Sequence, residues 1–291
     1  MKKKLMVIDV LVICIISILI IITVVGIGAF NIDKSYIIAN QYGNGVKIFG
    51  SGIYAHDSYF KAPIFIGSDF TMLFLVVPMA IVTLINEIKK RTIKSKLALI
   101  SVVGTILYYS TSIVFGVTYN ALHLAYIALF SSTFFAFIIL LKSIRIDELR
   151  RMQKWILPSR GLSIFLILTG IALFVAWLPD IFTSLVNKES LALIEVYTTE
   201  ITYVLDMGII SPTIFICLYL LKKKDGMGDV LLAIILNLCS VIGIMLPVQS
   251  VFQKLAGIEI PIQALITKLG IFVLLASVAL YFNIRLYKDI K

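Results

Sequence analysis

Long apolar runs separated by short polar segments occupy most of the chain. A run of about 18 or more apolar residues is long enough, as an α-helix, to cross a hydrocarbon layer about 30 Å thick. Such runs lie at residues 5–30, 67–86, 97–117, 121–141, 161–178, 196–221, 230–248 and 262–284. The pattern predicts an all-α, polytopic integral membrane protein, folded as a single bundle of about eight transmembrane helices.

One polar segment, residues 31–66, is long enough to carry structure of its own. Within it, the turn-forming pair Asn44-Gly45 lies between Tyr36–Gln41 and Val46–Phe49, which is a typical hairpin signal. We therefore expect two or three short strands that form a small cap on the membrane surface. An irregular loop lying over the bundle is the alternative.

Composition agrees with a membrane protein and narrows its chemistry. Hydrophobic residues make up 60% of the 291 positions and charged residues 14%, whereas a soluble domain is about half apolar and about a quarter charged. The three cysteines, Cys14, Cys217 and Cys239, fall inside predicted spans and indicate no disulfide or metal framework. The two histidines stand on different segments, which argues against haem. We expect no metal and no cofactor.

The positions of the 26 Lys and Arg residues predict the orientation of the bundle. Twenty of them lie at the amino terminus, in 87–96, 142–160 and 222–224, and after residue 284, all on one side of the predicted spans. The positive-inside rule therefore places both termini in the cytoplasm and the cap outside a plasma membrane. The net charge of +10 thus marks topology and not nucleic-acid binding. The first run exceeds a signal-peptide core in length, so we expect an uncleaved span.

A short basic segment between the fourth and fifth runs has a pattern of its own. In residues 142–156, apolar side chains recur at helical spacing with Arg and Lys between them. An amphipathic helix in the cytoplasmic interface, held by anionic lipid head groups, fits this pattern. A partner-docking surface is the alternative.

The second and sixth runs resemble each other. Each has carboxylates in its outer half, a central proline (Pro78 or Pro212) and a lysine cluster beyond it. Because four runs separate them, two parallel halves of four spans would explain the likeness. The remaining runs do not align by eye.

Ionisable residues within the sixth run point to a candidate site. Asp206 would lie roughly 15 Å deep in a regular helix, where a charged aspartate costs about 2.5–3.5 kcal/mol on insertion scales. Glu200 precedes it by less than two turns, and Lys268 of the eighth run lies at the same level as a potential counter-charge. A neutral Asp206 that bonds to another helix, and a Lys268 that reaches outward to the interface, are the alternatives.

Other polar residues share this outer level. We add Asp69, His123, Tyr126 and Tyr203 to the candidate ligand- or ion-binding set, although helix capping and the aromatic belt explain such residues equally well. Pro212 is a candidate hinge because it removes an amide donor within a span.

These patterns favour a carrier or solute-binding membrane protein with an outward-facing polar site for a small solute or ion. A non-transporting protein that acts in sensing, assembly or resistance is the alternative, and an intramembrane enzyme with carboxylate acid–base chemistry ranks third. No nucleophile or metal-protease motif is present, so we assign no catalytic residue. The sequence does not predict an oligomeric state.

Overall fold

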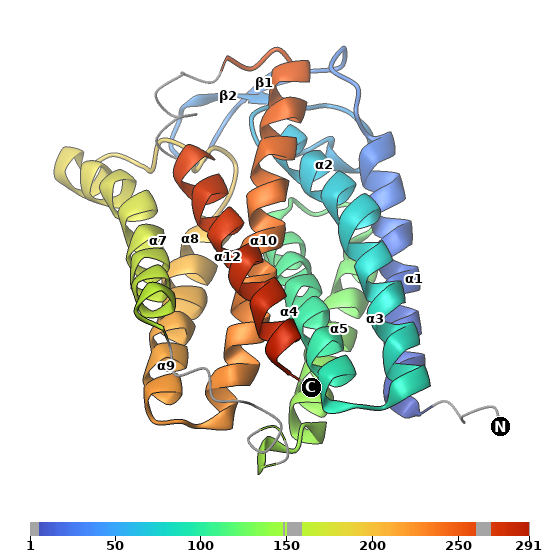
Figure 1. Ribbon diagram of the computed structural model, residues 1–291. Helices are drawn as coiled ribbons and strands as arrows, with labels where there is room; N and C mark the ends of the chain where they lie inside the picture. The colour runs from blue at the N-terminus through green and yellow to red at the C-terminus, as the bar shows by residue number, and fades with distance from the viewer. Residues whose placement is uncertain (1–5, 148, 150–158, 260–268, 291) are drawn as a thin grey trace.

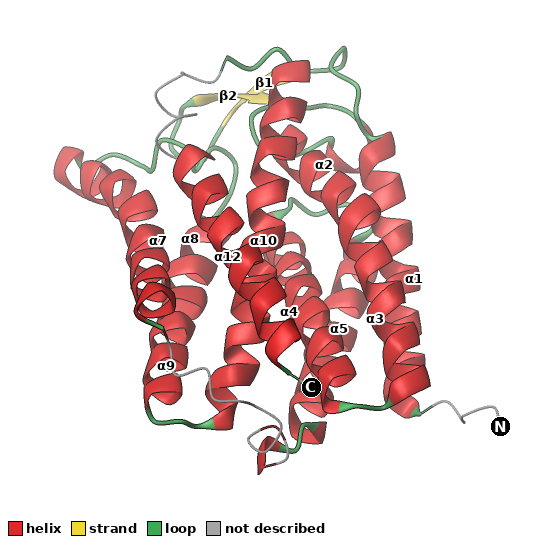
Figure 2. Ribbon diagram, viewed as in Figure 1, coloured by secondary structure: helices red, strands yellow, loops and turns green. Residues whose placement is uncertain are grey.

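The computed structural model describes residues 6–147, 149, 159–259 and 269–290. Eight of its helical segments are long and apolar enough to span a membrane, which confirms the predicted all-α, multi-pass architecture (Figures 1 and 2). The helices are α1 Val7–Gly28, α2 Ala62–Thr71, η2 Met72–Val76, α3 Val77–Lys90, α4 Ile93–Gly116, α5 His123–Ser143, α7 Arg160–Asn187, α8 Ile201–Leu205, η3 Asp206–Ile210, α9 Ser211–Lys222, α10 Gly226–Leu255 and α12 Ile271–Asp289.

The outer faces of these helices are apolar, as a lipid-facing surface requires. Large hydrophobic side chains such as Leu124, Val175 and Leu274 are exposed to the surroundings of the bundle. The two central helices, α4 and α10, are instead the most enclosed (Figure 1). Water cannot satisfy backbone groups in the hydrocarbon layer, so helices that bond internally are the expected solution.

Several helix boundaries differ from those that the apolar pattern predicts. The second span begins at Ala62, inside the predicted cap, and the seventh covers Gly226–Leu255. The sixth span begins at Ile201 and not at residue 196, because the preceding residues form turns in which Glu195 has a positive φ of 46°. Glu200 therefore precedes the helix. The fifth span continues through Pro179 to Asn187.

The second and sixth spans each contain a π-helical interruption, and two further π-helical residues, Leu269 and Gly270, stand directly before α12. Span α2–η2–α3 is π-helical over Met72–Val76, and span α8–η3–α9 is π-helical over Asp206–Ile210. In each case a proline, Pro78 or Pro212, follows two residues after the π-helix ends. Both the π-helices and the prolines are 134 positions apart (206 − 72 and 212 − 78). π-Helical turns are rare and frequent at functional sites.

The packing of the eight spans repeats from one half of the chain to the other. In each half, the first span packs on the second and the fourth, and the third packs on both the second and the fourth. Between the halves, α10 packs on α2 as α4 packs on α8, and α4 packs on α10. These relations are those expected of a pseudo-twofold axis between the halves, and α4 and α10 lie at the centre of the bundle (Figure 1).

Close approaches across the half-to-half interface follow the same symmetry. A Cβ on Gly67 of α2 would lie 2.6 Å from Cα of Gln249 on α10. A Cβ on Gly116 of α4 would lie 2.5 Å from Cγ2 of Ile201 on α8. A shift of 134 positions takes residue 67 to 201 and residue 116 to 250, so the two crossings correspond to within one residue. The structure thus supports the two parallel four-span halves suggested by the second and sixth runs.

A small hairpin covers the end of the bundle opposite the start of α1 and the end of α12 (Figure 1). Its strands, β1 Tyr36–Ala39 and β2 Gly45–Ile48, pair antiparallel with Tyr36 opposite Ile48 and Ala39 opposite Gly45. A short 3-10 helix, η1 Gly52–Tyr54, follows. The predicted hairpin is present, but its turn lies just before the Asn44-Gly45 pair: Gly45 already pairs with Ala39, and Gly43 takes the positive φ of 81°. We call residues 31–61 the hairpin segment.

A buried ion pair closes the end of the bundle where α1 begins. Arg91, in the turn between α3 and α4, donates hydrogen bonds to both carboxylate oxygens of Asp9 on α1. The Asp9 side chain is fully buried, and the hydrogen bonds to it raise the pKa of Arg91. Glu87 of α3 lies 3.7 Å from Arg91 and accepts a hydrogen bond of 2.5 Å from Ser95. Most of the predicted interfacial helix, 142–156, lies outside the described residues.

Candidate functional site

Asp69 is a fully buried carboxylate on α2, inside the second span. Its Oδ2 accepts a hydrogen bond of 2.6 Å from the hydroxyl of Tyr54, and its Oδ1 accepts one from the hydroxyl of Tyr109 on α4. Among the described residues, these two neutral phenols are its side-chain hydrogen-bond partners. Asp69 thus joins η1 of the hairpin segment to the centre of the bundle.

Asp206 is a buried carboxylate of the sixth span, and it opens the π-helix η3. Its Oδ1 accepts a hydrogen bond of 2.9 Å from the hydroxyl of Tyr108 on α4. Its Oδ2 accepts one of 2.9 Å from Nε1 of Trp177 on α7. Because Tyr108 belongs to the first half of the chain and Asp206 to the second, the bond to Tyr108 crosses the half-to-half interface.

Tyr203 and Tyr126 extend these two clusters. Tyr203 stacks on Trp177 with ring centroids 4.6 Å apart, and its hydroxyl donates to Asp180 at 2.9 Å. Tyr126 is buried near the Asp69 cluster, and its hydroxyl accepts a hydrogen bond of 3.3 Å from Asn120. Both tyrosines therefore lie beside predicted carboxylates without bonding to them directly.

The remaining candidate residues lie elsewhere or are not described. His123 is half-buried at the start of α5, and its ring packs on Tyr119 with centroids 5.3 Å apart. Pro212 lies in the first turn of α9, directly after η3. Lys268 is outside the described residues, so its pairing with Asp206 or Glu200 stays a prediction.

Glu200 has a cationic partner that the sequence pattern does not indicate. Nζ of Lys61, at the start of α2, forms an ion pair with Glu200, and both side chains are about nine-tenths buried. The same Nζ lies 4.2 Å from the ring centroid of Tyr197. We call the segment between α7 and α8 the 188–200 loop. The contacts of Lys61 join the hairpin segment to this loop.

A second set of contacts joins the same two segments. Ser58 donates a hydrogen bond from its Oγ to Glu195, and burial raises the pKa of Glu195. The hydroxyl of Tyr197 donates to Oδ1 of Asp57 at 3.0 Å. Burial raises the pKa of Asp57 to about 7, although hydrogen bonds from Thr118 and Tyr197 act in the opposite direction.

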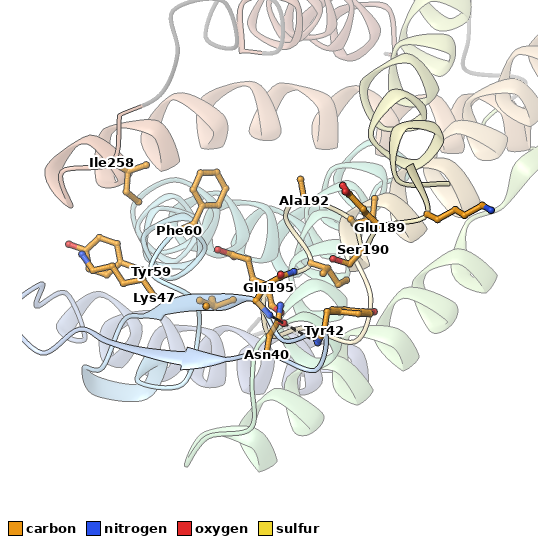
Figure 3. Close-up of a pocket in the computed structure, with 16 residues that line it drawn as sticks. Asn40, Tyr42, Lys47, Tyr59, Phe60, Glu189, Ser190, Ala192, Glu195 and Ile258 are labelled. Atoms are coloured by element: carbon orange, nitrogen blue, oxygen red, sulfur yellow. Dashed lines mark hydrogen bonds between the residues drawn. The ribbon is translucent and has the colours of Figure 1, made fainter. Parts of the chain in front are cut away.

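A surface pocket of about 800 Å³ opens between these two segments (Figure 3). Asn40, Tyr42 and Lys47 line it from the hairpin side, and Glu189 and Glu195 from the 188–200 loop. Tyr59 and Phe60 form a further aromatic wall, in which Nζ of Lys47 lies 3.6 Å from the ring centroid of Tyr59. The lining thus combines both charges, amides and aromatic faces, which suits a small polar solute.

Comparison with known proteins identifies no relative of this chain. No protein-family model, curated protein or solved structure matches the chain. Any functional inference therefore rests on the geometry of these residues alone.

Sequence reasoning assigned no role to several residues of these clusters. Tyr54, Asp57 and Lys61 belong to a polar segment outside the predicted spans, where such residues are ordinary. Trp177 looks like an interfacial aromatic. Tyr108 and Tyr109 form a polar pair inside an apolar run, and that pairing is the signal that could have identified them.

Proposed function

We propose that this protein is a membrane carrier in which Asp69 and Asp206 bind and release protons while a small polar solute crosses the membrane. The observation that carries the proposal is the pair of carboxylates inside the spans, each hydrogen-bonded to two neutral donors. Because the helix begins at Ile201, Asp206 lies only about 8 Å along it, and a charged aspartate at the centre of a span would cost about 2.5–3.5 kcal/mol on insertion scales. Ionisable groups inside spans typically mark proton or substrate pathways.

The donors around Asp206 determine where its proton would sit. The indole of Trp177 can only donate, so Oδ2 must accept in both protonation states. A proton on Asp206 would therefore occupy Oδ1 and be donated to the oxygen of Tyr108. At Asp69 both partners are hydroxyls, and either one can reverse its direction. Protonation would thus change the hydrogen bonding of α4 to both carboxylates.

The repeated packing of the spans supports alternating access. Carriers built from parallel repeats place their sites at the interface between the repeats. Here Asp206 and Tyr108 bond across that interface, and so do Gln249 and Ser68, at 2.8 Å. Movement of one half against the other would have to break or re-form these bonds, which gives the protonation state of Asp206 a means of biasing the two arrangements.

The pocket between the hairpin segment and the 188–200 loop would be the entry site for the solute. We propose that this end faces outward and that both termini are cytoplasmic, because 20 of the 26 Lys and Arg residues belong to the opposite end. On this basis the protein belongs in the plasma membrane, with anionic lipid head groups against the basic loops.

A solute-binding protein without transport is the second candidate. The position of the pocket favours this candidate. Its lining residues come from the hairpin segment, Lys188–Glu195 and the stretch after α10. None of them lies in the middle of a span. Such a protein would sense or present a solute at one face of the membrane and use Asp69 and Asp206 as structural hydrogen-bond acceptors.

Reconstitution into sealed vesicles that contain a pH-sensitive dye distinguishes the two. A panel of amino acids, sugars and organic cations is added outside, and internal pH is recorded. A carrier predicts that at least one solute drives proton movement and that Asp206→Asn and Asp69→Asn abolish it. Asp33→Asn, which alters an exposed carboxylate of the hairpin segment, serves as the matched control.

Transport that survives Asp206→Asn unchanged would refute the role of this carboxylate. Solute binding without any proton movement would favour the second candidate. Infrared difference spectra during an acid titration give an independent readout, because a protonated aspartate has a carbonyl band that disappears on ionisation. The proposal requires that band to lose intensity in each Asn variant.

A further inference from the structure

Two buried oxygen atoms under the hairpin segment lack a hydrogen-bond partner. Among the described residues, Oδ2 of Asp57 and Oγ1 of Thr118 are the buried side-chain polar atoms without one. Asp57 lies between η1 and α2, and Thr118 lies in the connection between α4 and α5. Buried polar groups are nearly always bonded, so each exception requires an explanation.

The two atoms belong to one site. The backbone N–H of Thr118 donates to Oδ1 of Asp57 at 2.9 Å, which holds the threonine side chain next to the carboxylate. The hydroxyl of Tyr197 also donates to Oδ1, at 3.0 Å. Both donors therefore occupy the same oxygen, and Oδ2 is left without a hydrogen-bond partner that meets ordinary geometry, near the side chain of Thr118.

Asp57 forms no ion pair among the described residues, and the charge of Lys61 lowers its pKa only from a longer range. The Asp57 side chain is fully buried, and the nearest described cation on its own segment, Lys61, forms its ion pair with Glu200 and lies over the ring of Tyr197. A buried carboxylate needs a compensating charge as well as hydrogen bonds.

We propose that Asp57 and Thr118 bind a monovalent cation, Na⁺, between Oδ2 and Oγ1. Carboxylate and hydroxyl oxygens are the hard ligands that such a cation takes. A water molecule would satisfy both oxygens but leave the charge uncompensated. A proton on Oδ2 would remove the charge only below the pKa of Asp57, which burial raises to about 7. A cation satisfies both requirements.

The site joins three segments that are far apart in the sequence. Asp57 comes from the hairpin segment, Thr118 from the α4–α5 connection, and Tyr197 from the 188–200 loop. A bound cation would therefore stabilise the attachment of the hairpin segment to both halves of the bundle. The inference goes beyond the proposed carrier function and does not depend on it, because a sensor would need the same attachment.

The thermal stability of the purified full-length protein tests the site. Unfolding temperature is measured in detergent at pH 8 in NaCl and in choline chloride at equal ionic strength. Wild type is expected to unfold at a higher temperature in NaCl, with a shift that grows with the logarithm of Na⁺ concentration above the dissociation constant. Equal unfolding temperatures in the two salts would overturn the proposal and leave water as the occupant.

Variants connect the salt effect to the two residues. Asp57→Asn is expected to lose the Na⁺-dependent shift, whereas Asp33→Asn keeps it. Thr118→Val retains the carboxylate and is expected to need about tenfold more Na⁺ for the same shift, whereas Thr198→Val at an exposed site does not. If Asp57→Asn does not fold, Thr118→Val decides, and an Na⁺ response that it leaves unchanged would overturn the assignment.

Discussion

Tyr108 and Tyr109 are consecutive residues of α4, and their hydroxyls donate to different carboxylates, Asp206 and Asp69. Consecutive side chains on a helix point about 100° apart. Tyr108 therefore faces η3 in the second half of the chain, and Tyr109 faces α2 in the first half. The helix α4 therefore contacts both Asp69 and Asp206. A rotation of α4 would disturb both clusters together.

Removing either hydroxyl tests this relationship. Tyr109→Phe and Tyr108→Phe each leave a buried carboxylate oxygen without its donor, so each is expected to lower the free energy of unfolding by about 1–3 kcal/mol. Tyr119→Phe, at a highly exposed tyrosine, is the control and should change stability little. Equilibrium unfolding in mixed detergent micelles measures all three. Stability of Tyr109→Phe equal to that of the control would contradict the bond to Asp69.

The close crossing of α2 and α10 predicts a steric effect. Gly67→Ala would place its Cβ 2.6 Å from Cα of Gln249, and backbone atoms cannot yield as a side chain can. We expect a loss of about 1–3 kcal/mol in the free energy of unfolding. Gly208→Ala is the matched control, because nothing lies within 4 Å of its Cβ position. Equal melting temperatures for the two variants would show that the crossing is looser than described.

The ion pair at the opposite end predicts a large loss of stability. Arg91→Ala would leave the carboxylate of Asp9 buried without its partner, at a cost of roughly 3 kcal/mol. Arg91→Lys keeps the charge but loses the two-pronged contact, so its loss should be smaller. Unfolding in mixed micelles compares the two with wild type. Equal losses would mean that the geometry, and not the charge, stabilises this end.

Asp57 predicts how stability depends on pH in the absence of Na⁺. Its folded pKa of about 7 exceeds the ordinary value of 3.8 because of burial, so the folded state holds the proton more tightly than the unfolded state. Stability should therefore be greatest below pH 4, fall as pH rises to about 7, and then level off. Melting curves in choline chloride between pH 4 and 8 measure this.

Asp57→Asn provides the control for that titration. The variant should show a shallower slope of the same sign, because burial also raises the pKa of Glu195. Stability that rises between pH 5 and 7 in the wild type would contradict the buried environment of Asp57.

The eight spans could be predicted because each depends on local length and apolarity. The observed helix ends differ from the predicted ones where polar residues interrupt the apolar pattern. The apolar run that contains Glu200 predicts a helix from residue 196, but the helix begins only at Ile201. Glu195 has a positive φ and accepts a hydrogen bond from Ser58, which is far from it in the sequence. A local sequence pattern contains no information on such a contact.

The partners of the carboxylates could not be predicted. Charge complementarity suggested Lys268 for Asp206, whereas the described partners are the neutral donors Tyr108 and Trp177. Glu200 pairs with Lys61, which stands 139 positions away. Such pairings depend on how spans meet in space, and a single sequence gives no information on that.

The matching π-helices suggest a history for the chain. A π-turn takes one residue more than an α-turn, and the same surplus residue, followed by a proline, recurs 134 positions later. One insertion in a four-span unit that was later duplicated and fused would place both of them. That unit would have paired with itself as a symmetric dimer. Asp69 now aligns with Tyr203, and Asp206 with Met72, so neither carboxylate has a counterpart in the other half. The two halves therefore share the placement of a π-helix and a proline but not the placement of their buried carboxylates.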